Sequence, residues 1–282
     1  RYFNSKHHNE IPYNLYIATN NYHQSLDTEL SSKILKERYS ELNSRDTIRQ
    51  CLHNINDLGI CTIDVEGIMY HGWVIRADIT KDVELKPTDE VLSALNENVK
   101  NYRRFKWEHY KNKGITFTKD VVYGKEQIKV YNKYAELLSH SRKFLDSLPN
   151  RSEVLNFFYG KTRFEITLRS EEQITERLRV GTGIMDFFNA LDCAVREQFD
   201  RVFNTSATIL DTTQCKGYEE WSIAHLLDAY KGDLKQIEQS LRDNSVYNSR
   251  NGLNERMKKF MVVKDKICRK ENEIIKQVRN LL

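Results

Sequence analysis

Three segments of the chain alternate polar and apolar residues, and this alternation limits the possible folds more than any other feature of the sequence. They read WVIRADIT at residues 73–80, IKVYNK at residues 128–133 and TRFEITL at residues 162–168. Successive side chains of a β-strand point to opposite faces. Each segment therefore predicts a strand with one apolar and one polar face, as in an antiparallel sheet that packs on helices with one side.

Turn signals and helical spacing of apolar residues surround these strands. Gly124-Lys125, between the strand-like runs ITFTKDVVY and EQIKVYNK, predicts a hairpin turn. A further strand is expected at GICTIDV, residues 59–65. Helices are expected over residues 31–58, from Pro87 to about residue 112, and over residues 134–148.

The C-terminal third has a different pattern, because strand signals end after about Gly181. Three amphipathic helices are expected there, near residues 183–203, 219–241 and 253–282. The sequence thus predicts an α+β domain at residues 1–180, followed by a helical region at residues 181–282.

The composition is that of a chain that folds around a core, with 39% hydrophobic and 30% charged residues among 282. No apolar run approaches the roughly 20 residues that a transmembrane helix needs, so no membrane partner is expected. The five cysteines are widely spaced and form no Cys-x-x-Cys pair, which favours reduced thiols in the cytoplasm. The net charge of +4 is too small to indicate nucleic acid binding by itself.

The polar faces of the three strands carry residue types that bind metals and phosphates. Carboxylates are preferred ligands of Mg²⁺ and Mn²⁺, cations neutralise a phosphodiester, and a phenol beside both can attack phosphorus. The alternative is the ordinary solvated face of an antiparallel sheet, where alternating charges are common. If the strands are neighbours, one face gathers Arg76, Asp78, Tyr131, Lys133, Arg163 and Glu165.

Three short motifs, in this order, are similar to those of a known family. They are RADIT at residues 76–80, YNKYAEL at residues 131–137 and RFE at residues 163–165. Together they resemble the gene II replication proteins of filamentous phages and, more distantly, the plasmid initiators of the replication-initiation-factor group. The resemblance covers residues 30 to 170 and does not extend to the C-terminal helices.

This resemblance implies an HUH-like replication nuclease fold and a rolling-circle replication initiator in the cytoplasm of a bacterial host. It makes Tyr131 the nicking nucleophile, which joins the 5′ end as a phosphotyrosine and frees a 3′-OH primer. It makes Asp78 and Glu165 the metal site, with Glu165 in place of the histidines of related HUH nucleases, and two carboxylates favour Mg²⁺ or Mn²⁺. Lys133 would stabilise the phenolate or hold the phosphate, with a solvated surface lysine as the alternative.

Three neighbours of these residues complete the candidate set. Glu136 corresponds to a glutamate of the family and is included as a metal ligand, although a carboxylate favoured at a helix N-terminus explains it equally well. Asp82, two residues past the strand, is a weaker candidate in a loop. Tyr134 is the nearest competitor of Tyr131, but it has the opposite strand parity.

A basic and aromatic segment at residues 100–113 predicts contact with DNA. Cations follow phosphates and aromatic rings stack on unpaired bases, so a single-stranded or hairpin origin is the expected partner. A host helicase is a further candidate partner, and the oligomeric state is left open. An ordinary helix with an aromatic core face is the alternative. The candidate DNA-binding residues are Arg76, Arg103, Arg104, Lys106, Trp107 and Arg163.

Other functions remain open from the sequence. A non-catalytic DNA-binding protein would need only the basic segments, and the intact set of Asp78, Tyr131, Lys133 and Glu165 argues against it. A relaxase or transposase would use the same tyrosine chemistry, but the lack of a histidine cluster favours the gene II type. A glycosidase-like pair of carboxylates would leave the tyrosine and the lysine unexplained.

Overall fold

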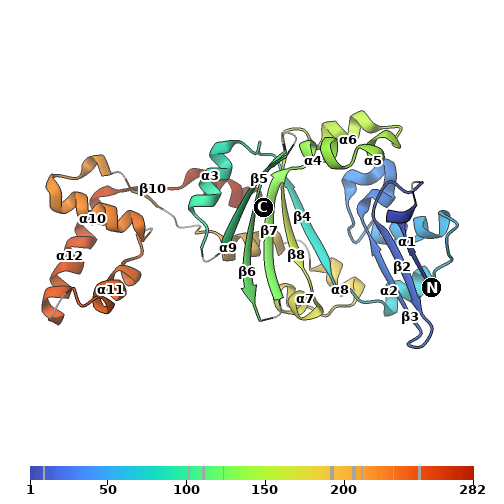
Figure 1. Ribbon diagram of the computed structural model, residues 1–282, viewed down its shortest axis with the longest axis horizontal. Helices are drawn as coiled ribbons and strands as arrows, with labels where there is room; N and C mark the ends of the chain where they lie inside the picture. Colours follow the sequence, from blue (N-terminus) through green and yellow to red (C-terminus); the bar gives the residue numbers. More distant parts are fainter. Residues whose placement is uncertain are drawn as a thin grey trace. The chain divides into compact units, whose positions relative to one another are not determined.

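The computed structural model divides the chain into two compact units (Figure 1). The first unit comprises Arg1–Leu92, Asn101–Val202 and Leu281–Leu282, and the second comprises Ser93–Lys100 and Phe203–Asn280. The first unit therefore continues past residue 180, where the sequence analysis placed the domain boundary. The structure describes residues 1–8, 10–100, 102–109, 112–122, 124–190, 194–204, 208–210, 212–230, 232–246 and 249–282.

A five-stranded antiparallel sheet forms the centre of the first unit. Its strands, in spatial order, are β4 (Ala77–Val83), β8 (Thr162–Leu168), β7 (Gly124–Asn132), β6 (Asn112–Val121) and β5 (Arg103–His109). The predicted hairpin is β6–β7, and the predicted strand at residues 162–168 has the same bounds in the structure. The α+β class with an antiparallel sheet is thus confirmed.

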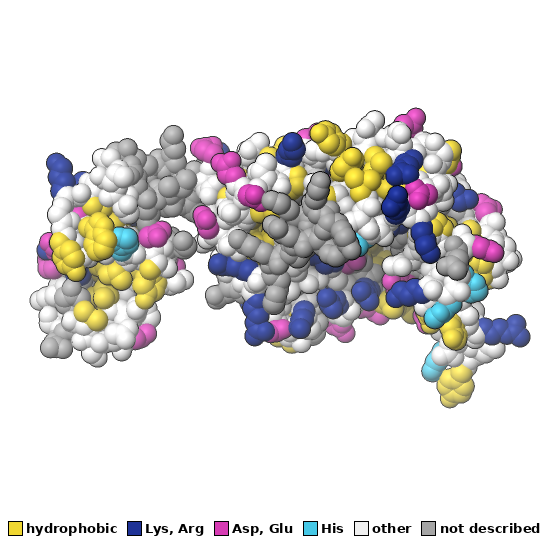
Figure 2. Space-filling model, turned by 45° about the horizontal axis from the view of Figure 1, so that its top comes forward, with side chains coloured by type: hydrophobic (Ala, Val, Ile, Leu, Met, Phe, Trp, Pro, Cys, Tyr) yellow, Lys and Arg dark blue, Asp and Glu magenta, His cyan; other side chains and the backbone are white. Residues whose placement is uncertain are grey.

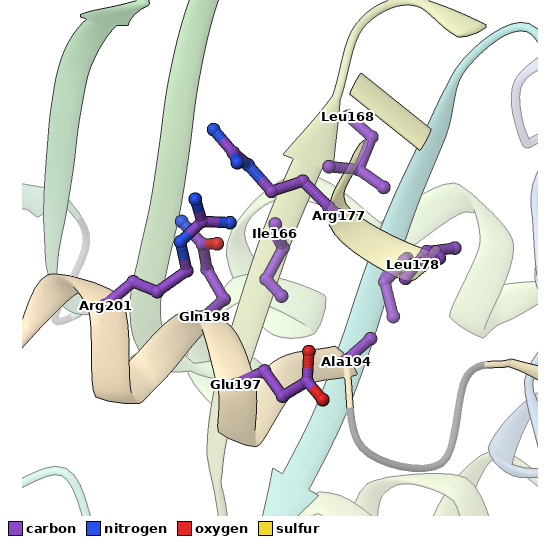
Figure 3. A pocket seen from close by; sticks show the side chains of 9 residues that line it. Ile166, Leu168, Arg177, Leu178, Ala194, Glu197, Gln198 and Arg201 are labelled. Carbon is purple, nitrogen blue, oxygen red and sulfur yellow. The ribbon is translucent and has the colours of Figure 1, made fainter. Parts of the chain in front are cut away.

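The apolar face of the sheet packs against α7 (Glu171–Leu178) and α9 (Ala194–Val202). Phe164 of β8 meets Phe199 of α9 edge to face, with 6.0 Å between the ring centroids. Figure 3 shows Ile166 and Leu168 of β8 facing these helices, with the side chains of Gln198 and Arg201 side by side. This burial explains why one parity of β8 carries Phe164, Ile166 and Leu168.

A buried carboxylate joins these helices to the sheet. Glu126 of β7 is 5% exposed, accepts a hydrogen bond from the Tyr102 hydroxyl at 2.6 Å, and pairs with Arg177 of α7 at 2.9 Å. Burial would raise the pKa of Glu126, but the hydrogen bonds and the nearby arginines outweigh it, so this pKa lies below its usual value. The group is therefore charged and paired, as a buried carboxylate must be.

The N-terminal part of the first unit adds a three-stranded antiparallel sheet that the sequence analysis did not predict. Its strands are β1 (Tyr2–Asn4), β2 (Leu15–Asn20) and β3 (Ser25–Leu30). Tyr39 contributes to its core, since its ring centroid lies 5.1 Å from that of Phe144 and 5.5 Å from that of Phe158. The helices around this core are η2 (Ser32–Glu41), α1 (Ile48–Asp57), α2 (Val65–His71), α4 (Lys133–His140), α5 (Arg142–Asp146) and α6 (Arg151–Phe158).

The second unit has its own apolar core, which includes Ala224, Leu227, Phe260 and Ile267. Figure 2 shows hydrophobic side chains beside a histidine on the surface of this unit. Its elements include β9 (Thr208–Leu210), α10 (Gly217–Ala229), α11 (Leu234–Asp243), α12 (Arg250–Ile267) and β10 (Cys268–Glu271). The short helix α8 (Ile184–Asn189) belongs to the first unit, while α3 (Asp89–Glu97) and α13 (Glu273–Leu281) each have residues in both units.

Several predicted elements were wrong in type or length. Residues 59–65 form no strand, because Asp64 caps the N-terminus of α2 and accepts a hydrogen bond from Gly67 N. The helix expected from Pro87 to residue 112 ends at Glu97, and residues 103–109 of the basic segment after it form strand β5. The helix expected over residues 31–58 is broken between η2 and α1, and each predicted C-terminal helix is two helices. None of the helices in the described ranges combines the length and the apolarity needed to cross a membrane.

Candidate active site

The register of the central sheet arranges the polar side chains in rows that cross the strands. Residues directly opposite each other in an antiparallel pair lie on the same face. Asp78, Tyr131 and Glu165 thus lie on one face of three neighbouring strands, which confirms the arrangement expected from parity. The three rows are Asp82, Arg163, Tyr131 and Gly114; Thr80, Glu165, Lys129 and Thr116; and Asp78, Thr167, Gln127 and Thr118.

Tyr131 and Glu165 form the centre of this face. The Tyr131 hydroxyl donates a hydrogen bond of 2.7 Å to Glu165 Oε2, and Lys129 Nζ donates one of 2.5 Å to Glu165 Oε1. Burial, and then the charge of Glu165, raise the pKa of Tyr131 well above its usual value. Burial also acts to raise the pKa of Glu165, but Lys129 outweighs it and holds this pKa below its usual value. At neutral pH the pair is therefore a protonated phenol bonded to an ionised carboxylate.

Lys133 lies at the start of α4 rather than on the strand, because Asn132 ends β7 and caps the helix by accepting a hydrogen bond from Ala135 N at 3.0 Å. The Lys133 ammonium pairs with Glu136 and lies 6.0 Å from the centroid of the Tyr131 ring. Lys133 is 6% exposed, so the expected alternative of a solvated surface lysine is wrong. Burial would raise the pKa of Glu136, but Lys133 outweighs it and lowers this pKa.

Arg163 and Asp82 form a buried bidentate ion pair across β8 and β4. Arg163 Nε and Nη2 donate to the two carboxylate oxygens of Asp82 at 2.8 and 2.6 Å. The two side chains are only 5% and 7% exposed, and the guanidinium carbon lies 5.2 Å from the centroid of the Phe158 ring. Burial would lower the pKa of Arg163, but Asp82 outweighs it and raises this pKa. Asp82 is a strand residue, not the loop residue expected, and it neutralises Arg163, which was expected to contact DNA.

Two further motif residues lie near the start of β4. Asp78 is exposed and forms no hydrogen bond or ion pair with the part of the chain that is described. Arg76 precedes β4 and is also exposed. Within the described ranges, no group of three or more histidine, cysteine or acidic side chains could hold a metal ion. Glu136, held by Lys133 and Ser141, thus does not complete a three-carboxylate site with Asp78 and Glu165.

Residues 103–109 of the predicted DNA-binding segment form β5, the edge strand of the sheet. Arg103 and Arg104 are both exposed, and Arg103 makes a 3.8 Å contact with Asp120. Because the two arginines are consecutive, they point to opposite faces of the strand. Basic residues on an edge strand also prevent edge-to-edge pairing, which is a structural explanation for their presence. Lys106 and Trp107 belong to β5, but their side chains lie outside the described residues.

Three residues near the site were not among the candidates from the sequence. Strand parity already places Lys129 on the face of Tyr131, but it was not included in the candidate set. Ser141 donates a hydrogen bond of 3.3 Å to Glu136 Oε1, and Lys33 donates one of 2.7 Å to Ser141 Oγ. Lys33 and Ser141 are 108 residues apart, so no local pattern in the sequence links them.

Residues 61–186 match the family model of the N-terminal domain of the phage gene II replication-associated protein. The resemblance to gene II replication proteins is thereby confirmed for these residues, which are called the gene II-like segment below. This segment contains the whole central sheet, and every residue of the three rows lies within it. No curated protein and no solved structure matches the chain.

Proposed function

We propose that this chain initiates rolling-circle replication by nicking one DNA strand with Tyr131 as the nucleophile. The observation that carries the proposal is the hydrogen bond from the Tyr131 hydroxyl to Glu165 within the gene II-like segment. In the proposed reaction the Tyr131 hydroxyl has to lose its proton, and the Glu165 carboxylate beside it can accept this proton. In this proposal the partner is a single-stranded or hairpin origin in the bacterial cytoplasm, with a host helicase as the next protein to act.

The chemistry follows from the pKa values of the pair. Because the pKa of Tyr131 is raised, its hydroxyl needs a base in order to attack phosphorus, and the ionised Glu165 accepts that proton as the oxygen–phosphorus bond forms. The bond from phosphorus to the 3′-oxygen breaks, and this oxygen takes a proton and leaves as a 3′-hydroxyl. The product is a 5′-phosphotyrosine, which conserves the phosphodiester bond so that the reverse reaction can close a circle.

The cations of the site support a reaction at a phosphodiester. Lys129 and Lys133 lie on either side of the Tyr131–Glu165 pair, close enough for both to lower the pKa of Glu165. They would stabilise the negative charge that develops on the phosphate oxygens during the attack. Tyr131 is only 6% exposed, so the DNA strand has to displace the side chains that cover the phenol before the reaction.

Asp78 and Glu165 fit a Mg²⁺ or Mn²⁺ ion by the chemistry of their donor atoms. Mg²⁺ is commonly bound through one or two carboxylates together with substrate phosphates, and these two side chains come from neighbouring strands on the same face. A bound ion would withdraw charge from a non-bridging phosphate oxygen.

The proposed function is tested with overlapping single-stranded oligonucleotides that cover the replicon carrying the gene. Each is incubated with the whole chain and Mn²⁺ or EDTA, and covalent adducts are detected on denaturing gels. The expected result is a metal-dependent adduct with a few neighbouring oligonucleotides only. If no oligonucleotide gives an adduct but some bind tightly, the chain is a non-catalytic DNA-binding protein instead.

Asp78→Asn is expected to raise the Mn²⁺ concentration needed for half-maximal adduct formation by about tenfold or more, because it removes a charged oxygen ligand. Exposed Asp27 of β3 provides a matched control, and Asp27→Asn should leave this concentration unchanged. Titration of adduct formation with Mn²⁺ measures both. If both variants need the same Mn²⁺ concentration for half-maximal adduct formation, Asp78 is not a metal ligand.

Replacement of Arg103 and Arg104 by Gln is expected to weaken binding to all single strands alike. Each lost phosphate contact should reduce the slope of log affinity against log salt concentration by about 0.7. Arg151→Gln, at an exposed ion pair on α6, is the matched control. Affinities are measured by fluorescence anisotropy at several salt concentrations. An unchanged slope of log affinity against log salt concentration would mean that the two arginines protect the sheet edge and do not contact DNA.

A further inference from the structure

Lys33 reaches the candidate active site from outside the gene II-like segment. It lies on η2, whereas the family match begins at residue 61. Its ammonium donates a hydrogen bond of 2.7 Å to Ser141 Oγ and lies 5.5 Å from the centroid of the Phe144 ring. Lys33 is half-buried, so part of the residue remains exposed to solvent.

A run of polar contacts connects Lys33 to the proposed nucleophile. Ser141 Oγ donates a hydrogen bond of 3.3 Å to Glu136 Oε1, and Glu136 pairs through its other oxygen with Lys133. Lys133 in turn lies 6.0 Å from the centroid of the Tyr131 ring. Lys33 and Tyr131 thus belong to one connected polar group, which is built from η2, α4 and β7.

The charges of this group do not balance. Three cations each have a carboxylate partner, as Lys129 pairs with Glu165, Lys133 with Glu136, and Arg163 with Asp82. Lys33 is the fourth cation, and within the described ranges it forms no ion pair with a carboxylate. Burial and the charge of Lys133 lower the pKa of Lys33 to about 8, against the opposite effect of Glu136. The site therefore carries one partly buried positive charge without a counter-ion.

We propose that Lys33 binds a phosphate of the DNA strand at the nicking site, so that the segment before residue 61 completes the binding site. An uncharged side chain could hold Ser141 equally well without the cost of removing an ammonium from water. The unbalanced charge instead fits a phosphate, which would supply the missing anion. This inference rests on the proposed function, because it takes the ligand to be the strand that Tyr131 attacks.

The test compares Lys33→Met, Lys33→Arg and the control Lys36→Met, an exposed lysine on the same element. All three are made in a Tyr131→Phe background, so that binding is measured without reaction. The probe is the fluorescein-labelled oligonucleotide that gives the adduct with the wild type. At pH 7 Lys33→Met should raise Kd by about tenfold or more, as expected for a charge-assisted hydrogen bond, whereas Lys36→Met and Lys33→Arg should bind within about threefold of the parent.

A pH profile separates phosphate binding from a structural role. The groups that face Lys33 are Ser141, Lys133, Glu136 and Arg163. Because free Lys33 loses its proton near pH 8, the affinity of the parent should fall between pH 7 and pH 9, with proton uptake on binding. A guanidinium stays charged over this range, so Lys33→Arg should bind with a flatter profile.

Two results would overturn the inference. One is that Lys33→Met binds as tightly as Lys36→Met, and the other is that Lys33→Arg keeps the pH profile of the parent. If Lys33→Met does not fold, the pH profiles of Lys33→Arg and the parent still test the inference. If no oligonucleotide gives an adduct, the proposed nicking function fails by itself, and the same comparisons made with dT20 test phosphate binding by Lys33 separately.

Discussion

Tyr131→Phe is expected to abolish strand nicking and the covalent protein–DNA adduct together, while the affinity for the same oligonucleotide changes by less than about threefold. The substitution removes only the phenolic oxygen, which is the atom that would bond to phosphorus. Loss of a group that merely positions DNA would instead lower strand nicking and adduct formation only in part. A denaturing gel measures the adduct, and fluorescence anisotropy measures the affinity.

The fold should tolerate this change. Glu165 retains its hydrogen bond from Lys129, so the carboxylate is not left unpaired when the phenol is lost. A hydrogen bond to a charged group contributes roughly 1.5–3 kcal/mol, and the free energy of unfolding should fall by no more than that. Thermal unfolding of the variant is the measurement, and a much larger loss would mean that absent activity reports misfolding.

Tyr134→Phe is the matched control. Tyr134 lies on α4, where its ring meets Tyr159 with 5.4 Å between the centroids, rather than on the sheet face with Glu165. This variant should form the adduct as the wild type does. A metal-dependent adduct that persists in Tyr131→Phe and disappears in Tyr134→Phe would identify the neighbouring tyrosine as the nucleophile.

The polar face of the sheet was predictable because strand parity is a local property. Once residues 128–132 and 162–168 form strands, the period of two places Tyr131 and Glu165 on definite faces. The pairing partner of each residue was not predictable in the same way, because it depends on the register between strands. Asp82 was assigned to a loop because the predicted strand ended at Thr80, whereas β4 continues to Val83 and its register places Asp82 opposite Arg163.

The errors arose where two local patterns competed. Residues 103–109 read RRFKWEH, with Phe105 and Trp107 in alternation, which is a strand signal. The predicted helix extended the apolar spacing of α3 across this segment instead. At residues 59–65 a β-prone run ends in Asp64, whose capping of α2 determined the local structure.

The position of Lys33 in the candidate site could not be predicted from local sequence patterns. Its position in the candidate site depends on the packing of η2 beside α5, where Tyr39 and Phe144 share a core. Nothing in the sequence around residue 33 indicates that its side chain meets Ser141. Contacts of this kind are determined by tertiary packing, and only the folded chain shows them.

The Arg163–Asp82 pair is expected to give the largest changes in stability. Arg163→Met leaves the Asp82 carboxylate buried without a partner, and Asp82→Leu does the same to the guanidinium. Removing one member of a buried ion pair costs roughly 3–5 kcal/mol. Each single variant should therefore lower the free energy of unfolding of the first unit by about this amount. Arg151→Met, at an ion pair whose side chains are 43% and 50% exposed, should cost less than about 1 kcal/mol.

The double variant Arg163→Met with Asp82→Leu separates the value of the pair from the cost of an unpaired charge. Since both charges are gone, and apolar side chains can fill the space beside Phe158, it should be more stable than either single variant. Urea unfolding followed by hydrogen exchange of the β4 and β8 amides confines the measurement to the first unit. Additive losses in the double variant would contradict the prediction, because they would mean that Arg163 and Asp82 act independently despite their bidentate contact.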